Sequence, residues 1–509
     1  MWRTRGPVLR SNIRSFLTPT TRRLRSKSSS PPEEAPYPQT HSIQQSFAHH
    51  PVFVLNVVRR FIKFSFIGLV VLGSTTAAAF EATHAWVENV ELKKREEDPE
   101  VIAWEWQRDI EKWNGDDGQG GTDPGLGFRG RHNVRAAWMA LNWGVGESTA
   151  VVGSDASSNA DGLLGPRGLK IIDPRLVRAE DSLRTAVDIA EQKSTEGKLQ
   201  SWTLSRILAL HASVLERMGP ESSLVAKEQY ERAWATQPRL TEESCRLATK
   251  LGDLCFRTGE HESALAWWGR SISMLQGKPS SSQNAQELVS GAMESEMPSS
   301  PSAQRTLLSV LASCSAFYAK SGRLQEAASL DEGAFNLTRS VRHPESMASI
   351  SPAHALHALT LLHRSSIFCI HRAEVSYALK DKVSVPIQWL STAAQSSERV
   401  ALALAVSTNP KSGAATDPSL SPAYTKSPAL NRPAASLLRD ARRAATEAWN
   451  LLGILKEQKD RQGALECYQH AVRWASKSDA FGTPAEETLS ADWAIVWGNY
   501  NRLKNTAKV

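Results

Sequence analysis

The longest apolar run in the chain lies near its N-terminus, at residues 64–80, where FSFIGLVVLGSTTAAAF contains no charged side chain. A helix needs roughly 20 mostly apolar residues to cross a bilayer core about 30 Å thick. With residues 61–63 added, including a Lys63 that can snorkel to the headgroups, the run reaches that length. The pattern predicts a transmembrane helix over residues 61–80. The alternative is a buried core helix, which rarely contains two glycines in its apolar run.

Beyond residue 81, apolar residues recur at intervals of three and four, which predicts helices throughout and no strand. Stretches rich in Gly, Ser, Pro and Asn separate the helical segments at 115–130, 277–304, 340–353 and 407–434. Asp98 followed by Pro99 is typical of a helix start. The apolar stripe of this predicted helix is Ile102, Trp106, Ile110 and Trp113.

A second short helix is predicted over Val134–Trp143, after Asn133. The region before residue 145 is dense in tryptophan. These side chains fit either a membrane–water interface or packing against the next domain. They are Trp86, Trp104, Trp106, Trp113, Trp138 and Trp143.

Four segments repeat one pattern of small and bulky residues at matching offsets. Residues 245–272 and 310–335 match at every step, and an upstream and a C-terminal copy match less fully. Small residues let two helices cross closely, and a bulky residue fills the space between pairs. The defining residues are Leu251, Gly252, Ala264, Trp268, Tyr318, Gly322, Ala327, Ala226, Tyr230, Pro238, Trp449, Gly453, Ala464 and Tyr468.

This pattern resembles the tetratricopeptide repeat, a helix–turn–helix unit of about 34 residues. Degenerate units are expected at Pro174–Gln192 and Ala353–Val406. The resemblance implies an all-α fold, a tetratricopeptide (TPR) helical-repeat solenoid preceded by one N-terminal transmembrane helix. Such a solenoid has a concave groove lined by the first helix of each pair. Repeat geometry predicts these groove-facing, partner-binding candidates: His211, Arg246, Asp253, Arg257, Lys320, Asn450 and Glu457.

The net charge of +7 is unevenly distributed. Residues 1–63 hold eleven Lys or Arg and two acids, a balance of +9, so the rest of the chain carries −2. Phosphate binding needs clustered positive charge on the folded domain, so nucleic acid is not an expected partner. The first 32 residues contain no acid, and they are rich in Arg and Ser. This composition predicts a mitochondrial presequence, with a basic tail on a protein anchored in the endoplasmic reticulum as the alternative.

Catalytic and metal-binding patterns are missing from the sequence. HExxH, GxSxG and P-loop motifs do not occur, and the nearest Cys/His group is Cys369 with His363 and His371. The five cysteines are odd in number and predict no disulfide framework, including for Cys245 and Cys255. We therefore expect no enzyme activity and no cofactor.

The order of parts resembles the fungal-type tetratricopeptide adaptors of the mitochondrial inner membrane that serve the i-AAA protease. That order is a leader and presequence over residues 1–50, a span over 61–80, tryptophan-rich helices and a Gly-rich linker over 81–145, a solenoid over 170–480 and a tail over 481–509. The resemblance implies an N-terminus in the matrix and a repeat domain in the intermembrane space. There the domain would bind unfolded substrate segments and present them to an AAA protease complex for protein quality control.

Two other functions remain open on the sequence. A respiratory-complex assembly factor could have the same anchor and repeats, and the complex that co-purifies would distinguish it. An import receptor that reads presequences would need an acidic groove facing the cytosol.

Overall fold

A computed structural model describes residues 49–93, 98–113, 115, 120–144, 151–153, 170–277, 285–341, 350–405, 420–476 and 490–506. The predicted presequence lies outside the described residues, apart from the last two positions of the 1–50 leader. The chain divides into two units, residues 1–77 and 78–509.

The described residues of the first unit belong to α1 (His49–Trp86), which continues past residue 77. Within the described chain, α1 is the one helix long and apolar enough to cross a membrane, and the predicted span 61–80 lies wholly inside it. The hydroxyls of Ser74, Thr75 and Thr76 each donate to a carbonyl one turn earlier. Polar groups within lipid require such internal acceptors.

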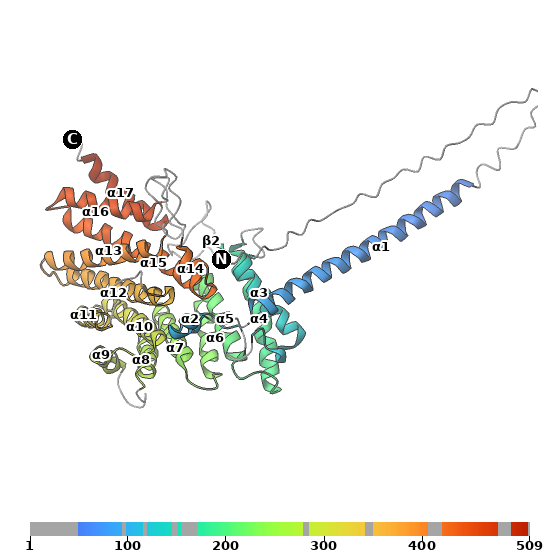
Figure 1. Ribbon diagram of the computed structural model, residues 1–509, viewed down its shortest axis with the longest axis horizontal. Coiled ribbons are helices and arrows are strands. Elements are labelled where there is room, and N and C mark those ends of the chain that lie inside the picture. Colours follow the sequence, from blue (N-terminus) through green and yellow to red (C-terminus); the bar gives the residue numbers. More distant parts are fainter. Residues whose placement is uncertain are drawn as a thin grey trace, which may run out of the picture. The chain divides into compact units, whose positions relative to one another are not determined.

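The second unit consists of helix pairs that stack in chain order (Figure 1). Each pair packs on the next, so the core lies between neighbours along the stack. The pairs are α3 (Gly127–Trp143) with α4 (Pro174–Thr195), α5 (Thr203–Met218) with α6 (Ser223–Ala235), α7 (Glu242–Arg257) with α8 (His261–Leu275), α10 (Pro301–Lys320) with α11 (Leu324–Ser340), α12 (Pro352–Ala378) with α13 (Ser384–Leu404), and α15 (Pro428–Lys456) with α16 (Arg461–Ala475). The last helix, α17 (Ser490–Thr506), packs on α16.

Close helix crossings occur where the repeat pattern predicts them. A Cβ atom built on Gly252 would lie 2.4 Å from Nε1 of Trp268, and one built on Gly453 would lie 2.6 Å from the ring of Tyr468. Both aromatic side chains are fully buried. Gly322 ends α10 with φ +75°, the left-handed conformation that favours glycine. The described chain is therefore an all-α solenoid of the tetratricopeptide type.

The α10–α11 pair replaces the aromatic side chain by a buried acid. Asp331 occupies the position of Trp268 and Tyr468, and it accepts a hydrogen bond of 2.6 Å from the hydroxyl of Ser315. Asp331 is 1% exposed, and burial raises its pKa to about 8. This carboxyl group is therefore largely protonated at neutral pH.

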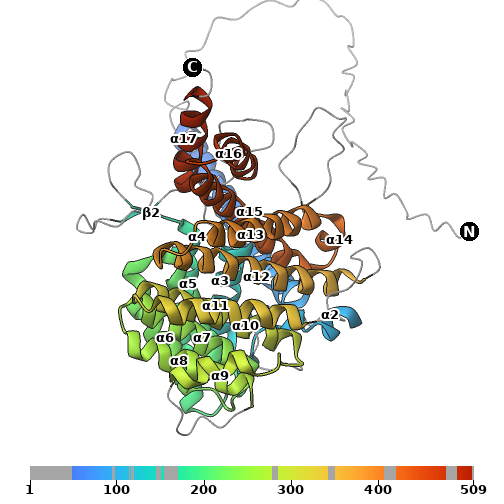
Figure 2. The same cartoon turned by 90° about the vertical axis from the view of Figure 1, so that its left-hand side faces the viewer.

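Several elements differ from the sequence prediction. Helix α9 (Ala285–Glu294) forms inside the predicted break 277–304, because Leu288, Val289 and Ala292 make an apolar face that is buried. It packs on α8 and α11. Likewise, α14 (Pro422–Thr425) and the first turns of α15 occupy part of the predicted break 407–434. Two short strands, β1 (Val151–Gly153) and β2 (Lys170–Ile172), pair antiparallel where no strand is predicted. Figure 2 labels β2.

The helix predicted from Asp98 is much shorter than its apolar stripe suggests. Asp98 does accept a hydrogen bond of 3.0 Å from the backbone N–H of Glu100, but α2 (Pro99–Ala103) ends after five residues. Glu105 then adopts φ 54°, and a short 3₁₀ turn, η3 (Trp106–Arg108), follows. The predicted apolar stripe does not form one helix face, because the side chains of this segment bind separate sites on the solenoid.

The end of α1 is held against α3, which begins at Gly127 rather than after Asn133 as the sequence predicts. A π-helical turn, η2 (Val87–Glu91), follows α1. The Glu88 carboxylate accepts hydrogen bonds of 2.8 Å from the backbone N–H and the hydroxyl of Thr122 and from Arg131. These charge-assisted bonds fix residues 78–91 to the first helix pair.

Candidate functional site

The first helices of the solenoid line a groove with a volume of about 1540 Å³. Side chains of α7, α10, α12 and α15 form one wall. The facing wall consists mainly of residues that precede the solenoid in sequence, Glu91–Lys93 and Trp106–Trp113. We call residues 98–113 the strap. The groove predicted from the repeat geometry is therefore present, and part of the chain's own N-terminal region lies along it.

Arg305 of α10 makes more contacts with the strap than any other described side chain of the groove. Its guanidinium donates to the Asp109 carboxylate at 2.7 Å and to the carbonyls of Trp104 and Glu105 at 3.2 Å each. It also lies over the Trp106 ring, 4.0 Å from the centroid, a favourable cation–π distance. Burial lowers the pKa of Arg305 and Asp109 opposes that shift, yet an arginine stays charged in proteins.

The strap carboxylates are also bound by a side chain of α7 and by donors at the start of α10. Arg246 donates to Asp109 at 3.2 Å. Glu105 accepts hydrogen bonds from the Ser300 hydroxyl and from the backbone N–H of Ser302, at 3.1 Å for the second. These donors belong to the first turn of α10, where unpaired N–H groups and the helix dipole favour an anion.

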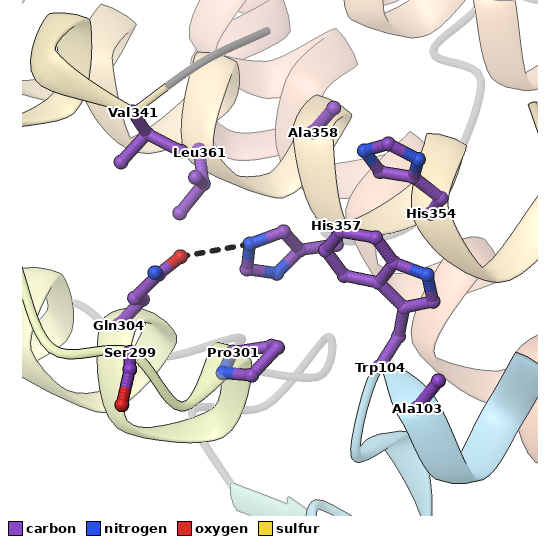
Figure 3. A pocket seen from close by; sticks show the side chains of 10 residues that line it. All are labelled: Ala103, Trp104, Ser299, Pro301, Gln304, Val341, His354, His357, Ala358 and Leu361. Carbon is purple, nitrogen blue, oxygen red and sulfur yellow. Dashed lines mark hydrogen bonds between the residues drawn. The ribbon is translucent and has the colours of Figure 1, made fainter. Parts of the chain in front are cut away.

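The two strap tryptophans bind at the start of α12. The Trp106 indole N–H donates to the Ala353 carbonyl at 2.9 Å, and the side chain is 3% exposed. Trp104 stacks on His354 with ring centroids 4.0 Å apart and an interplanar angle of 11° (Figure 3). Behind Trp104 lies a cavity of about 360 Å³, into which His357 and Leu361 also project.

The strap extends along the first helices from α12 towards α5. The Ser351 hydroxyl, which caps α12, donates to Glu100 at 2.7 Å. At the other end, the Ser213 hydroxyl of α5 donates to Glu111 at 3.3 Å, and Lys112 lies 3.5 Å from Glu243 of α7. Glu111 also lies 3.8 Å from Arg432 of α15, so the strap contacts five helix pairs, as a bound peptide would in a solenoid groove.

Two of the seven predicted groove residues, Arg246 and Asp253, lie in the groove lining. Burial raises the pKa of Asp253, which accepts a hydrogen bond of 3.1 Å from the Trp268 indole. Arg246 binds the strap as described above.

The other five predicted groove residues lie outside this lining. His211 is 4% exposed and bonds to Glu180 at 3.2 Å, because α4 covers its side of α5. The C-terminal helix α17 packs on the last repeat, and its side chains contact the two candidates of that repeat, Asn450 and Glu457. The remaining placements are Arg257 paired with Glu216, Lys320 over the Phe256 ring, Asn450 bonded to Asn499, and Glu457 paired with Arg502.

The sequence prediction missed three arginines of the groove wall. Arg305, Arg364 and Arg432 carry no motif, and only their placement on α10, α12 and α15 identifies them. Arg364 is half-buried, its pKa is lowered by burial, and no described carboxylate lies within ion-pair distance of it.

A buried Ser–His–Asp group occurs away from the groove. The Ser315 hydroxyl bonds to Asp331 on one side and lies 3.2 Å from Nδ1 of His371 on the other. A catalytic triad requires the histidine between the serine and the acid, so this order does not suit nucleophilic catalysis. The described residues also contain no group of three or more His, Cys, Asp or Glu side chains that could hold a metal ion.

Comparisons with known proteins give little further detail. No family model matches the chain, and no curated protein matches it. Among solved structures, a monomeric IFIT1 mutant with m7Gppp-AAAA is 13% identical, covering 74% of this chain and 79% of that chain with a TM-score of 0.23. The human IFIT1 dimer with m7Gppp-AAAA is 10% identical, covering 84% and 93% with a TM-score of 0.22. At these scores the likeness carries no argument about ligand, and the chain is described by its own architecture: an all-α, tetratricopeptide-type scaffold suited to binding other proteins.

Proposed function

We propose that this protein is a membrane-anchored adaptor that binds segments of other proteins in its concave groove and presents them to an i-AAA protease. The anchor would hold it in the mitochondrial inner membrane, with its N-terminus in the matrix and its solenoid in the intermembrane space. In this role the protein performs no chemistry itself. It raises the local concentration of substrates beside the protease.

One observation carries the proposal: the same chain contains a helix apolar enough to span a membrane and a solenoid with a groove of about 1540 Å³. Extended peptides bind such solenoid surfaces through several separate side-chain sites. The groove offers such sites, since its lining combines basic side chains of α7, α10, α12 and α15 with polar groups such as Thr306 and Thr360.

The charge of the groove bears on the alternative functions. The lining contributed by α7, α10, α12 and α15 has five basic and two acidic side chains, a net charge of +3. A receptor for cationic presequences would need the opposite sign. The charge of the groove does not separate a respiratory-complex assembly factor from a protease adaptor, and only the protein that co-purifies distinguishes the two.

The test is affinity purification of the C-terminally tagged protein from gently solubilised mitochondria, read by mass spectrometry. We expect an AAA protease as the dominant partner, together with its substrates. Ser309→Trp, which places a bulky side chain in the groove, should lose the substrates. Ser391→Trp is the matched control, because Ser391 is also half-buried with an intrahelical hydroxyl bond but lies on α13, outside the lining. Respiratory-chain or translocase subunits as dominant partners would contradict the proposal.

The orientation is tested by protease protection. The tagged solenoid should resist added protease in intact mitochondria and be digested once the outer membrane is ruptured. Digestion in intact mitochondria would place the groove in the cytosol and exclude the proposed location.

A further inference from the structure

We propose that the groove recognises an extended, acidic segment carrying tryptophan or another large aromatic side chain, and that the strap is an intramolecular competitor for this site. The inference rests on the proposed peptide-binding role of the groove. It adds the chemistry of the partner and a means of regulation.

The strap is bound as a peptide is bound, through a few side chains in separate sites. Trp106 is 3% exposed, whereas Ile102 and Ile110 of the same segment are 47% and 41% exposed. The segment also leaves helical geometry after Ala103, so its backbone does not form a packed helix. Val101 is the one aliphatic side chain of the strap that is buried, at 2% exposed. The Trp106 ring and the carboxylates of Glu105 and Asp109 supply the polar and aromatic contacts.

The charges of the strap and of the groove wall are complementary. The strap carries five acidic and two basic side chains, a net charge of −3, against the +3 of the wall. The specific contacts follow the same rule, since Asp109 binds two arginines and Glu105 binds the start of α10. Complementary potentials of this kind select a partner by its charge. A competing segment must therefore be acidic.

The strap leaves space that a better ligand could fill. The cavity of about 360 Å³ beside Trp104 is lined by Pro301, Val341 and Leu361, together with His354 and His357 (Figure 3). An apolar cavity of about 150 Å³ already holds a benzene ring. A partner segment with one more large apolar side chain at this position would bury surface that the strap does not bury, and could displace it.

Tethering makes the strap an effective inhibitor. A short connection holds it at an effective concentration of about 1 mM. If the same segment bound in trans with a Kd of about 10 µM, the tethered copy would weaken an equivalent competitor roughly 100-fold. The partner's apparent affinity would then depend on whether the strap is seated.

The experiment converts the strap into a separate peptide without altering the groove. Protease sites are placed at 94–97 and 116–119 of the full-length protein in detergent micelles, and both are cut. A fluorescent peptide of residues 98–113 is then added, and its binding is read by anisotropy while circular dichroism monitors the fold. Before cutting, the peptide should bind at least 30-fold more weakly than after the released strap is washed away.

Peptide variants test the stated chemistry. Peptides with Trp106→Ala or Asp109→Asn should bind the cut protein at least 10-fold more weakly, whereas the Ile102→Ala peptide should bind as the parent does, because Ile102 is exposed in the seated strap. Three results would overturn the inference: a cut strap that cannot be exchanged, a solenoid that loses its helicity when the strap leaves, and equal binding of all four peptides. None of these involves the protease, so they would leave the proposed adaptor function to its own test.

Discussion

The contact between Gly252 and Trp268 makes the repeat geometry testable. An alanine Cβ at position 252 would lie 2.4 Å from Nε1 of Trp268, where ordinary van der Waals contact begins near 3.4 Å. The indole would therefore have to move by about 1 Å. It is fully buried, with the rings of Phe256 and Phe317 against it, and its N–H donates to Asp253. We expect Gly252→Ala to destabilise the solenoid.

The expected loss of unfolding free energy on Gly252→Ala is the balance of three effects. Replacing glycine by alanine inside a helix favours folding by about 1 kcal/mol. Overpacking a tight core costs about 1–3 kcal/mol, and disturbing the indole hydrogen bond costs about 1 kcal/mol more. The net loss should be about 1–3 kcal/mol. Gly291→Ala is the matched control, because no atom lies within 4 Å of its Cβ position in α9, and it should gain up to about 1 kcal/mol.

The assay is urea unfolding of the full-length protein in detergent, followed by circular dichroism at the helical band. The Gly252→Ala midpoint should fall and the Gly291→Ala midpoint should not. In a Trp268→Leu background, Gly252→Ala should cost less than in the parent, because the clashing ring is gone. A Gly252→Ala protein as stable as the Gly291→Ala protein would refute the helix crossing described here.

Three further outcomes are expected. The pKa of Asp331 is about 8 in the folded protein against an ordinary 3.8. The free energy of unfolding should therefore fall by up to about 1.4 kcal/mol per pH unit as pH rises from 4 to 8. Asp331→Asn should flatten this pH dependence in urea melts at several pH values, and an unchanged slope would contradict the prediction. Lys320→Ala should leave the melt within about 0.5 kcal/mol of the parent, because the side chain is exposed on the Phe256 ring. All five cysteines are free and buried, so a maleimide reagent should label them only in denaturant, and rapid labelling of the native protein would count against the packing described.

The repeat positions could be predicted because they depend on local spacing. Gly252 and Trp268 are sixteen residues apart, within one helix pair, and the same offset separates Ser315 from Asp331. A small residue on one helix and a large one on its partner suffice to fix such a crossing. The long apolar helix α1 could be predicted as well, because an uncharged run of that length favours a continuous helix.

The strap could not be predicted because its contacts are long-range. Glu105 binds Ser302, 197 positions away, and Trp106 binds Ala353, 247 positions away. Periodicity alone favours one amphipathic helix for this segment. The groove sites instead select Trp106, Glu105 and Asp109, and their binding outweighs the helical preference. His211 lies outside the groove lining because it bonds to Glu180 of α4. The sequence predicts a helical unit over Pro174–Gln192, but not which side of α5 it covers.

Arg364 connects stability with binding. Its guanidinium is half-buried in the groove, and in the described part of the chain no carboxylate forms an ion pair with it; Asp253 and Asp440 are the acids whose field reaches it. A partly buried charge without a close partner costs stability, and proteins retain such groups at sites where a ligand completes the pair.

Arg364→Met should therefore raise the urea midpoint, by about 1 kcal/mol in unfolding free energy, while weakening the retention of acidic partner segments. Arg364→Lys is the control: it keeps the charge and should keep part of the binding, but it cannot form the bidentate contact that arginine makes with a carboxylate. If Arg364→Met destabilised the protein and left partner retention intact, the guanidinium would be a structural element of the solenoid. The groove's recognition of acidic segments would then have to depend on its other basic side chains, Arg246, Lys250, Arg305 and Arg432.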